Sequence, residues 1–177
     1  MRSRLCPLAV AVVVFTALAA RAALAQPPGA QAGGGPLVLY SFEDSCEGWR
    51  GLDSAGEEGP SCAAARLGGV SCLEIRGELP GTVGAFVKPA FGKADWFAFT
   101  HLLVSVYVPQ AAPPRVQAIV YVKDTDLCYY QHLRKNYLSP GAWTHLRLDL
   151  TGDSTMWEFR GHYKPWDGYC RQDVQEF

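Results

Sequence analysis

The stretch Val116–Gln131, VQAIVYVKDTDLCYYQ, carries the pattern that decides the fold. In its first half, valine and alanine alternate with Gln117, Tyr121 and Lys123. A period of two with one apolar face is typical of a half-buried strand in an antiparallel sheet. The residues KDTD favour a tight turn after this strand, because aspartate suits turn positions. The stretch therefore predicts two paired strands joined by a turn.

Two other segments alternate in the same way: LLVSVYVP at Leu102–Pro109 and WTHLRLDL at Trp143–Leu150. Further strands are expected to begin at Leu37, Val70, Val83 and Leu127. No stretch shows a convincing long helical period. Many short strands with turn signals at near-regular spacing indicate an all-β fold, an antiparallel β-sandwich.

The segments between these strands are expected to be irregular. We predict long loops at Ser45–Gly69, anchored by Trp49, and at Thr151–Tyr169. Ser139–Gly141 is expected to form a turn. Arg171–Phe177 is expected to hold one short helical turn.

Residues 1–25 have the features of a cleaved secretory signal peptide. Arg2 and Arg4 precede an apolar run from Leu8 to Ala20, and Ala23-Leu24-Ala25 matches an A-x-A cleavage site. The run is short for a membrane span, so an uncleaved anchor is the weaker interpretation. We therefore expect a secreted protein, periplasmic or extracellular.

The rest of the chain is long enough for one domain. Residues 26–36, QPPGAQAGGGP, are expected to form a flexible linker, and residues 37–177 the β-sandwich domain. The formal net charge is −1 and the sequence has no basic stripe, so we do not expect nucleic acid as a partner. No segment after the signal peptide is apolar and long enough to span a membrane.

Export would allow disulfides, but the cysteines do not pair evenly. Cleavage would remove Cys6 and leave an odd number: Cys46, Cys62, Cys72, Cys128 and Cys170. Cys62 with Cys72, Cys46 with either, and Cys128 with Cys170 are all plausible pairs, and the sequence does not choose among them. No Cys/His spacing is typical of a zinc site.

Several motifs together resemble those of a known group. LYSFED at Leu39–Asp44 followed by Gly48-Trp49, VSVYVP at Val104–Pro109, the paired strands of Val116–Gln131, and PGAWTHLRLDL at Pro140–Leu150 resemble galactose-binding-like β-jelly rolls. That group includes many non-catalytic carbohydrate-binding modules. The resemblance covers about Leu37 to Phe177 and implies a jelly-roll fold that binds a polysaccharide or glycan.

The resemblance also implies one more strand than the chain supplies. Val174–Phe177 is interpreted as the approach to a closing strand, after which the sequence stops. We therefore expect a sandwich missing its last strand and open along one edge. A C-terminally truncated domain, with further domains beyond Phe177, would account for this, because an uncovered strand is an aggregation liability.

The side of the strands away from the apolar face is the first candidate ligand site. Tyrosine rings provide flat apolar area with a polar tip, and amide and charged side chains provide directional hydrogen bonds. The predicted ligand-binding residues here are Tyr107, Gln117, Tyr121, Lys123, Tyr129, Gln131, His145 and Arg147. The alternative is an ordinary solvated sheet face.

The loop WEFRGHYKPWDGY is a second candidate, because it is unusually aromatic. Trp157, His162 and Trp166 are its predicted ligand-binding residues. The alternative is that the loop buries its own rings. The resemblance further implies a structural calcium, for which Glu43 and Asp149 are the candidate ligands.

Catalysis has little support. No pair of carboxylates has a spacing that singles it out for glycoside hydrolysis, and no G-x-S-x-G motif is present. The favoured function is a secreted carbohydrate-binding module without catalysis. A structural or interaction domain of an exported protein, and a small glycan-active hydrolase, are the alternatives.

Overall fold

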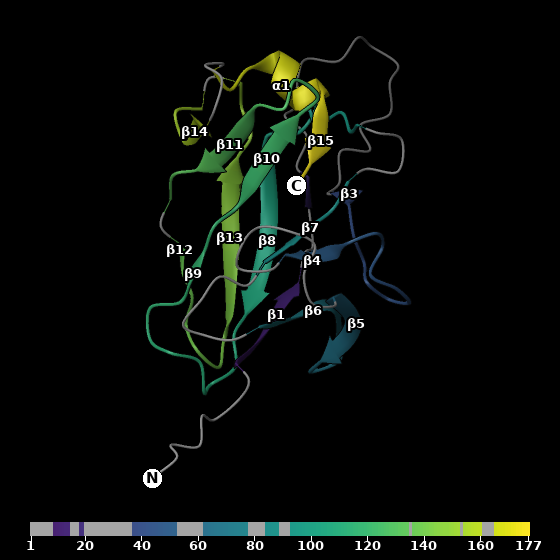
Figure 1. The fold of residues 1–177 in the computed structure, drawn as a ribbon, viewed down its shortest axis with the longest axis vertical. Helices are drawn as coiled ribbons and strands as arrows, with labels where there is room; N and C mark the ends of the chain where they lie inside the picture. Colours follow the sequence, from purple (N-terminus) through teal and green to yellow (C-terminus); the bar gives the residue numbers. More distant parts are fainter. Residues whose placement is uncertain are drawn as a thin grey trace, which may run out of the picture.

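The computed structural model describes residues 9–14, 18–19, 37–52, 62–77, 84–88, 93–134, 136–152, 154–160 and 165–177. Within these ranges nearly all of the regular secondary structure is β-strand, and the one helix is α1 (Gly168–Gln172) (Figure 1). All pairings between its strands are antiparallel, as in β10 with β11 and β8 with β13. The predicted all-β class is confirmed.

The larger sheet has five strands in the order β13-β8-β1-β6-β5. Their bounds are Trp143–Asp149 for β13, His101–Tyr107 for β8, Ala9–Val14 for β1, Val70–Gly77 for β6 and Cys62–Leu67 for β5. The β8–β13 pair runs in register along its whole length, from His101 opposite Asp149 to Tyr107 opposite Trp143. The two alternating segments predicted as strands therefore lie side by side.

The smaller sheet has four strands in the order β14-β11-β10-β15. Their bounds are Trp157–Arg160 for β14, Tyr129–His132 for β11, Tyr121–Asp124 for β10 and Val174–Glu176 for β15. β9 (Gln117–Ala118) pairs with β12 (Asn136–Tyr137) at the open end of the β10–β11 hairpin. Two further pairs are β4 (Arg50–Leu52) with β7 (Gly84–Phe86), and β2 (Leu18–Ala19) with β3 (Leu37–Val38).

The two larger sheets share one apolar core, which makes the fold sandwich-like. Val104 and Leu148 project into this core from the five-stranded sheet, and Val122 and Tyr130 from the four-stranded sheet. In Figure 1 the β10–β11 hairpin lies in front of β8 and β13. Trp49 is also buried in the core, so the prediction that it anchors its loop is confirmed.

Two segments predicted as loops contain strands. Residues 62–67 form β5 on the edge of the five-stranded sheet, and residues 157–160 form β14 on the edge of the four-stranded sheet. The sequence CAAARL of β5 has weak intrinsic preference for a strand, so pairing with β6 decides its conformation. The helical turn also lies earlier than predicted, because the Asp167 carboxylate accepts the backbone N–H groups of Tyr169 and Cys170 and starts α1.

The predicted turn at Ser139–Gly141 is present. Gly141 has a φ of 75° and donates its backbone N–H to the carbonyl of Val108 at 2.8 Å. A Cβ at this position would lie 2.2 Å from Gln110 Oε1. Only glycine fits here without displacing Gln110, and the turn delivers the chain into β13.

The C-terminal residues form a strand rather than the approach to one. β15 pairs with β10, and its other side is bonded to the segment between β7 and β8. Ala94 and Val174 exchange backbone hydrogen bonds of 2.7 and 3.1 Å, and Val87 and Phe177 exchange bonds of 2.8 and 3.1 Å. β15 therefore covers the edge of β10, and because β15 is itself bonded on its other side, the four-stranded sheet is not open here as the sequence led us to expect.

Part of the predicted signal peptide lies inside the five-stranded sheet. β1 (Ala9–Val14) runs antiparallel to both of its neighbours, with Ala9 opposite Gly77 of β6 and Val12 opposite Tyr107 of β8. Cleavage after Ala25 stays a prediction, and the linker at residues 26–36 lies outside the described residues. Within the described ranges, no helix is long and apolar enough to cross a bilayer.

Candidate functional site

The predicted ligand-binding residues lie on two different outer faces of the molecule. Tyr121, Lys123, Tyr129 and Gln131 alternate with the buried Val122 and Tyr130, so they face away from the core on the four-stranded sheet. Tyr107, His145 and Arg147 alternate with the buried Val106 and Leu146 on the five-stranded sheet. Because both sheets turn their inner faces to one core, the two groups do not form a single platform.

The outer face of the four-stranded sheet, here called the tyrosine face, is the denser of the two groups. It is defined by Tyr121, Lys123, Tyr129, Gln131, Glu158 and Glu176. The strand register places Gln131 opposite Tyr121 and Glu158, and Lys123 opposite Tyr129 and Glu176. Residues directly opposite in an antiparallel pair share a face, which brings these side chains from four strands together.

Two stacked rings form the centre of the tyrosine face. The ring centroids of Tyr121 and Tyr129 lie 5.0 Å apart with an interplanar angle of 28°. Both residues are half-buried, so part of the ring pair remains open to solvent. Offset stacking of this kind favours a fixed pair over two independently moving rings.

Charged groups border the ring pair. Lys123 Nζ lies 2.8 Å from Glu176 Oε1, and the Tyr121 hydroxyl donates to the same oxygen at 3.4 Å. Burial raises the pKa of Tyr121 well above its ordinary value of 10.0, and the Glu176 charge adds to the effect. The phenol therefore stays protonated at neutral pH and remains a hydrogen-bond donor.

The other outer face carries a separate polar strip. Tyr107 packs against Trp143 at 5.4 Å between ring centroids, and both cover the buried Cys72. Ser105 Oγ lies 2.8 Å from His145 Nδ1, and Arg147 is exposed on the same strand as His145. The Tyr107 and Trp143 rings pack over Cys72, so this pair has a structural role on the five-stranded sheet.

Gln117 belongs to neither group. It is exposed on β9, opposite the exposed Tyr137 of β12.

The aromatic residues described in the Trp157–Tyr169 segment are mostly buried. Trp157 and Trp166 are 6% and 5% exposed and stack on each other at 4.8 Å. Their indole N–H groups donate to the carbonyls of Asp149 and Thr151 at 2.6 and 3.0 Å. Neither ring presents a face to solvent, as the alternative interpretation of this segment supposed, and His162 lies outside the described residues.

The two candidate calcium ligands have different surroundings. Glu43 is exposed in the chain between β3 and β4. Asp149 Oδ1 accepts the backbone N–H and the hydroxyl of Thr151 at 2.9 and 2.7 Å, and these bonds lower the pKa of Asp149 against the opposing effect of burial. Within the described part of the chain, no three His, Cys, Asp or Glu side chains gather as a metal site.

Glu158 and Glu176 belong to the tyrosine face but were not predicted as ligand-binding residues. The signal for Glu176 was the C-terminal strand itself, because its register with β10 puts Glu176 opposite Lys123. Glu158 was not predicted because its strand, β14, lies in a segment that was expected to be a loop.

A buried histidine beneath this sheet makes stability depend on pH. His132 is 4% exposed, lies edge-on to Trp157, and accepts the backbone N–H of Arg134 at its Nδ1. Burial lowers its pKa from the ordinary 6.5, the Arg134 charge lowers it further, and the Asp149 charge opposes both. Below the ordinary pKa the unfolded chain binds more protons than the folded one, so stability falls as the pH drops.

We expect the melting temperature to fall between about pH 7.5 and about pH 5.5, and His132→Gln to flatten this dependence in that window. His145→Gln is the matched control, because His145 is exposed on β13. Thermal unfolding of the three proteins across the pH range measures the effect. Equal slopes for the wild type and His132→Gln would contradict it.

Comparison with known proteins finds no match to this chain: no family model, no curated protein and no solved structure is significantly similar. The site must therefore be interpreted from its own chemistry. The tyrosine face combines a flat ring pair with an ammonium, carboxylates and an amide. Such a set can hold a ligand through ring contacts and hydrogen bonds.

Proposed function

We propose that this protein is an exported, non-catalytic carbohydrate-binding module, and that its tyrosine face contacts the sugar. The observation that carries the proposal is the stacked Tyr121–Tyr129 pair, half-open to solvent and bordered by Lys123 and Gln131. A jelly-roll topology and a structural calcium, both implied by the resemblance of the sequence, belong to the same proposal.

The chemistry of the face suits a sugar. A pyranose ring has an apolar C–H side that packs on aromatic rings, and hydroxyls that need directional partners. The Gln131 amide can donate to a sugar hydroxyl, while the Glu158 carboxylate and the Tyr121 hydroxyl oxygen, whose proton goes to Glu176, can accept. Because the ring pair and the Lys123–Glu176 ion pair are already formed, little side-chain ordering would oppose binding.

The experiment is affinity electrophoresis of the chain through gels containing different polysaccharides, with and without calcium. We expect retention on at least one glycan, and about tenfold weaker retention for Tyr129→Ala, since about 1.4 kcal/mol corresponds to a tenfold change in affinity. Tyr137→Ala is the matched control, because Tyr137 is an exposed tyrosine on β12 outside the tyrosine face. Circular dichroism checks that each variant is folded.

Two outcomes would overturn the proposal. Equal loss of retention for Tyr129→Ala and Tyr137→Ala would place binding elsewhere. No retention on any glycan, by a folded wild-type chain, would favour the alternative of a structural or interaction domain. Retention that requires calcium would support the proposed structural calcium. Retention that is the same with and without calcium would contradict the calcium site but not glycan binding.

A further inference from the structure

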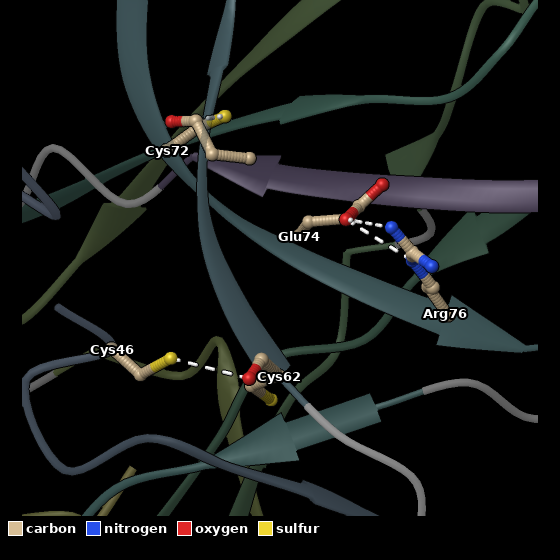
Figure 2. A network of polar contacts seen from close by, with 6 residues as sticks. Cys46, Cys62, Cys72, Glu74 and Arg76 are labelled. Atoms are coloured by element: carbon tan, nitrogen blue, oxygen red, sulfur yellow. Dashed lines mark hydrogen bonds and ion pairs between the residues drawn. The ribbon is translucent and has the colours of Figure 1, made fainter.

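Two half-buried cysteines lie close together where the chain between β3 and β4 meets the first residue of β5. Cys46 Sγ donates to the backbone carbonyl of Cys62 at 3.2 Å (Figure 2). The two residues are 16 positions apart in the sequence. Both pack against the same main core, on the inner side of the five-stranded sheet.

The geometry excludes the competing partner of Cys62. Cys62 lies opposite Ile75 in the β5–β6 ladder, whereas Cys72 lies opposite Ala65. Since Ala65 is three positions after Cys62 on the same strand, its side chain points to the opposite face. Cys72 accordingly packs under Tyr107 and Trp143 on the outer side of the sheet, away from Cys46 and Cys62 (Figure 2).

The remaining described cysteines are enclosed by other contacts. Cys170 is fully buried, and its Sγ lies 2.8 Å from the Tyr130 hydroxyl. Cys128 is 3% exposed in the same core. Cys46 and Cys62 are the two cysteines of the described chain that a soluble oxidant can reach without unfolding it.

Both cysteines of the pair are held in place by their surroundings. The Cys46 carbonyl accepts the backbone N–H of the buried Trp49 at 2.8 Å. The neighbouring Glu47 carboxylate accepts the backbone N–H groups of Ser41 and Phe42 at 2.9 and 2.6 Å. Cys62 is fixed by the β5–β6 ladder, so the two side chains meet without a search over loop conformations.

We propose that Cys46 and Cys62 form a disulfide that ties the chain between β3 and β4 to the edge strand β5.

The oxidant for this bond is a disulfide, such as oxidised glutathione. One thiolate attacks it to give a mixed disulfide, and the second thiolate displaces the leaving thiol. Two protein thiols become one disulfide while the oxidant takes two electrons and two protons and becomes two thiols. Burial and the nearby Cys46 raise the pKa of the Cys62 thiol to about 11, so the pair reacts faster as the pH rises.

The test exposes the full chain to a glutathione redox buffer, unfolds it in acidic denaturant, blocks the remaining thiols by alkylation, and digests it with trypsin without reduction. Cleavage after Arg50 and Arg66 puts Cys46, Cys62 and Cys72 on separate peptides. We expect mass spectrometry to find the Cys46 and Cys62 peptides cross-linked and the Cys72 peptide alkylated. Cys72→Ser should leave the cross-link intact, whereas Cys46→Ser should abolish it and leave Cys62 alkylated.

The bond should also stabilise the fold, because it closes a loop in the unfolded chain. We expect the oxidised protein to melt about 5–10 °C above the reduced one, and Cys46→Ser to remove this redox-dependent difference. Alkylation of both Cys46 and Cys62 under oxidising conditions, or a cross-link from either to Cys72, would overturn the proposal. The proposal does not depend on glycan binding, so either can fail alone.

Discussion

Replacing Phe177 with alanine is expected to lower the free energy of unfolding by about 3–5 kcal/mol. Phe177 is 5% exposed, and its ring packs edge-on against Trp49 at 5.7 Å and Trp96 at 5.3 Å. Truncation to alanine would leave a cavity between two tryptophans that are themselves fixed in the core. A loss of this size is a large fraction of the 5–15 kcal/mol that holds a typical domain together.

Chemical denaturation followed by tryptophan fluorescence measures the loss, since both neighbouring rings report on it. Ile119→Ala is the control, because Ile119 is 59% exposed and its truncation should change stability by less than about 0.5 kcal/mol. Removing residues 174–177 entirely should be worse than Phe177→Ala, because it also breaks the hydrogen bonds on both sides of β15. If Phe177→Ala and Ile119→Ala unfold alike, the end of the chain is not part of the core.

The strands that the sequence predicted share one property. Segments such as β8 and β13 alternate large apolar residues with polar ones, so one face alone can be buried. β5 lacks this contrast because it is rich in alanine, and β14 alternates tryptophan and phenylalanine with charged residues over only four positions. The conformation of both strands depends on pairing: β5 pairs with β6, the next strand along the chain, and β14 pairs with β11, which lies well before it in the sequence.

The sequence predicted most individual residues of the candidate site, but not which of them share a face of the folded protein. Alternation shows that Tyr107 and Tyr121 both point away from a core. It does not show which sheet each strand joins, and the two outer faces of a sandwich look alike in sequence. Strand order therefore separates Tyr107 from Tyr121 and adds Glu176 to the tyrosine face.

A chain that begins at Gln26 is expected to lose the middle strand of its five-stranded sheet. β1 is paired on both sides, from Ala9 to Val13 with β6 and from Val12 to Val14 with β8. Without it, β6 and β8 each present a row of unpaired backbone groups at the centre of the sheet. Such edges accept strands from other molecules, so this chain should associate more readily than the full-length one.

Hydrogen exchange compares the two chains strand by strand. Amides of β6 and β8 should exchange much faster in the chain that begins at Gln26, while those of β10 and β11, which belong to the other sheet and are not paired with β1, should change little. Sedimentation should show larger species for the shorter chain, and a synthetic peptide covering residues 9–14 should reverse both effects. Identical exchange and sedimentation would show that β1 contributes nothing to the sheet.

The difference between the two chains is important because the chain that begins at Gln26 is the predicted mature form. Cleavage after Ala25 and a sheet built around β1 cannot both describe the same exported molecule, unless another segment takes the place of β1. The N-terminal residue of the exported protein, read from its intact mass, distinguishes the two. If the N-terminal residue is Gln26, the gap between β6 and β8 is closed by rearrangement of those strands, filled by a strand from a second molecule, or left open. Slow amide exchange in β6 would indicate a closed or filled gap, and fast exchange an open one.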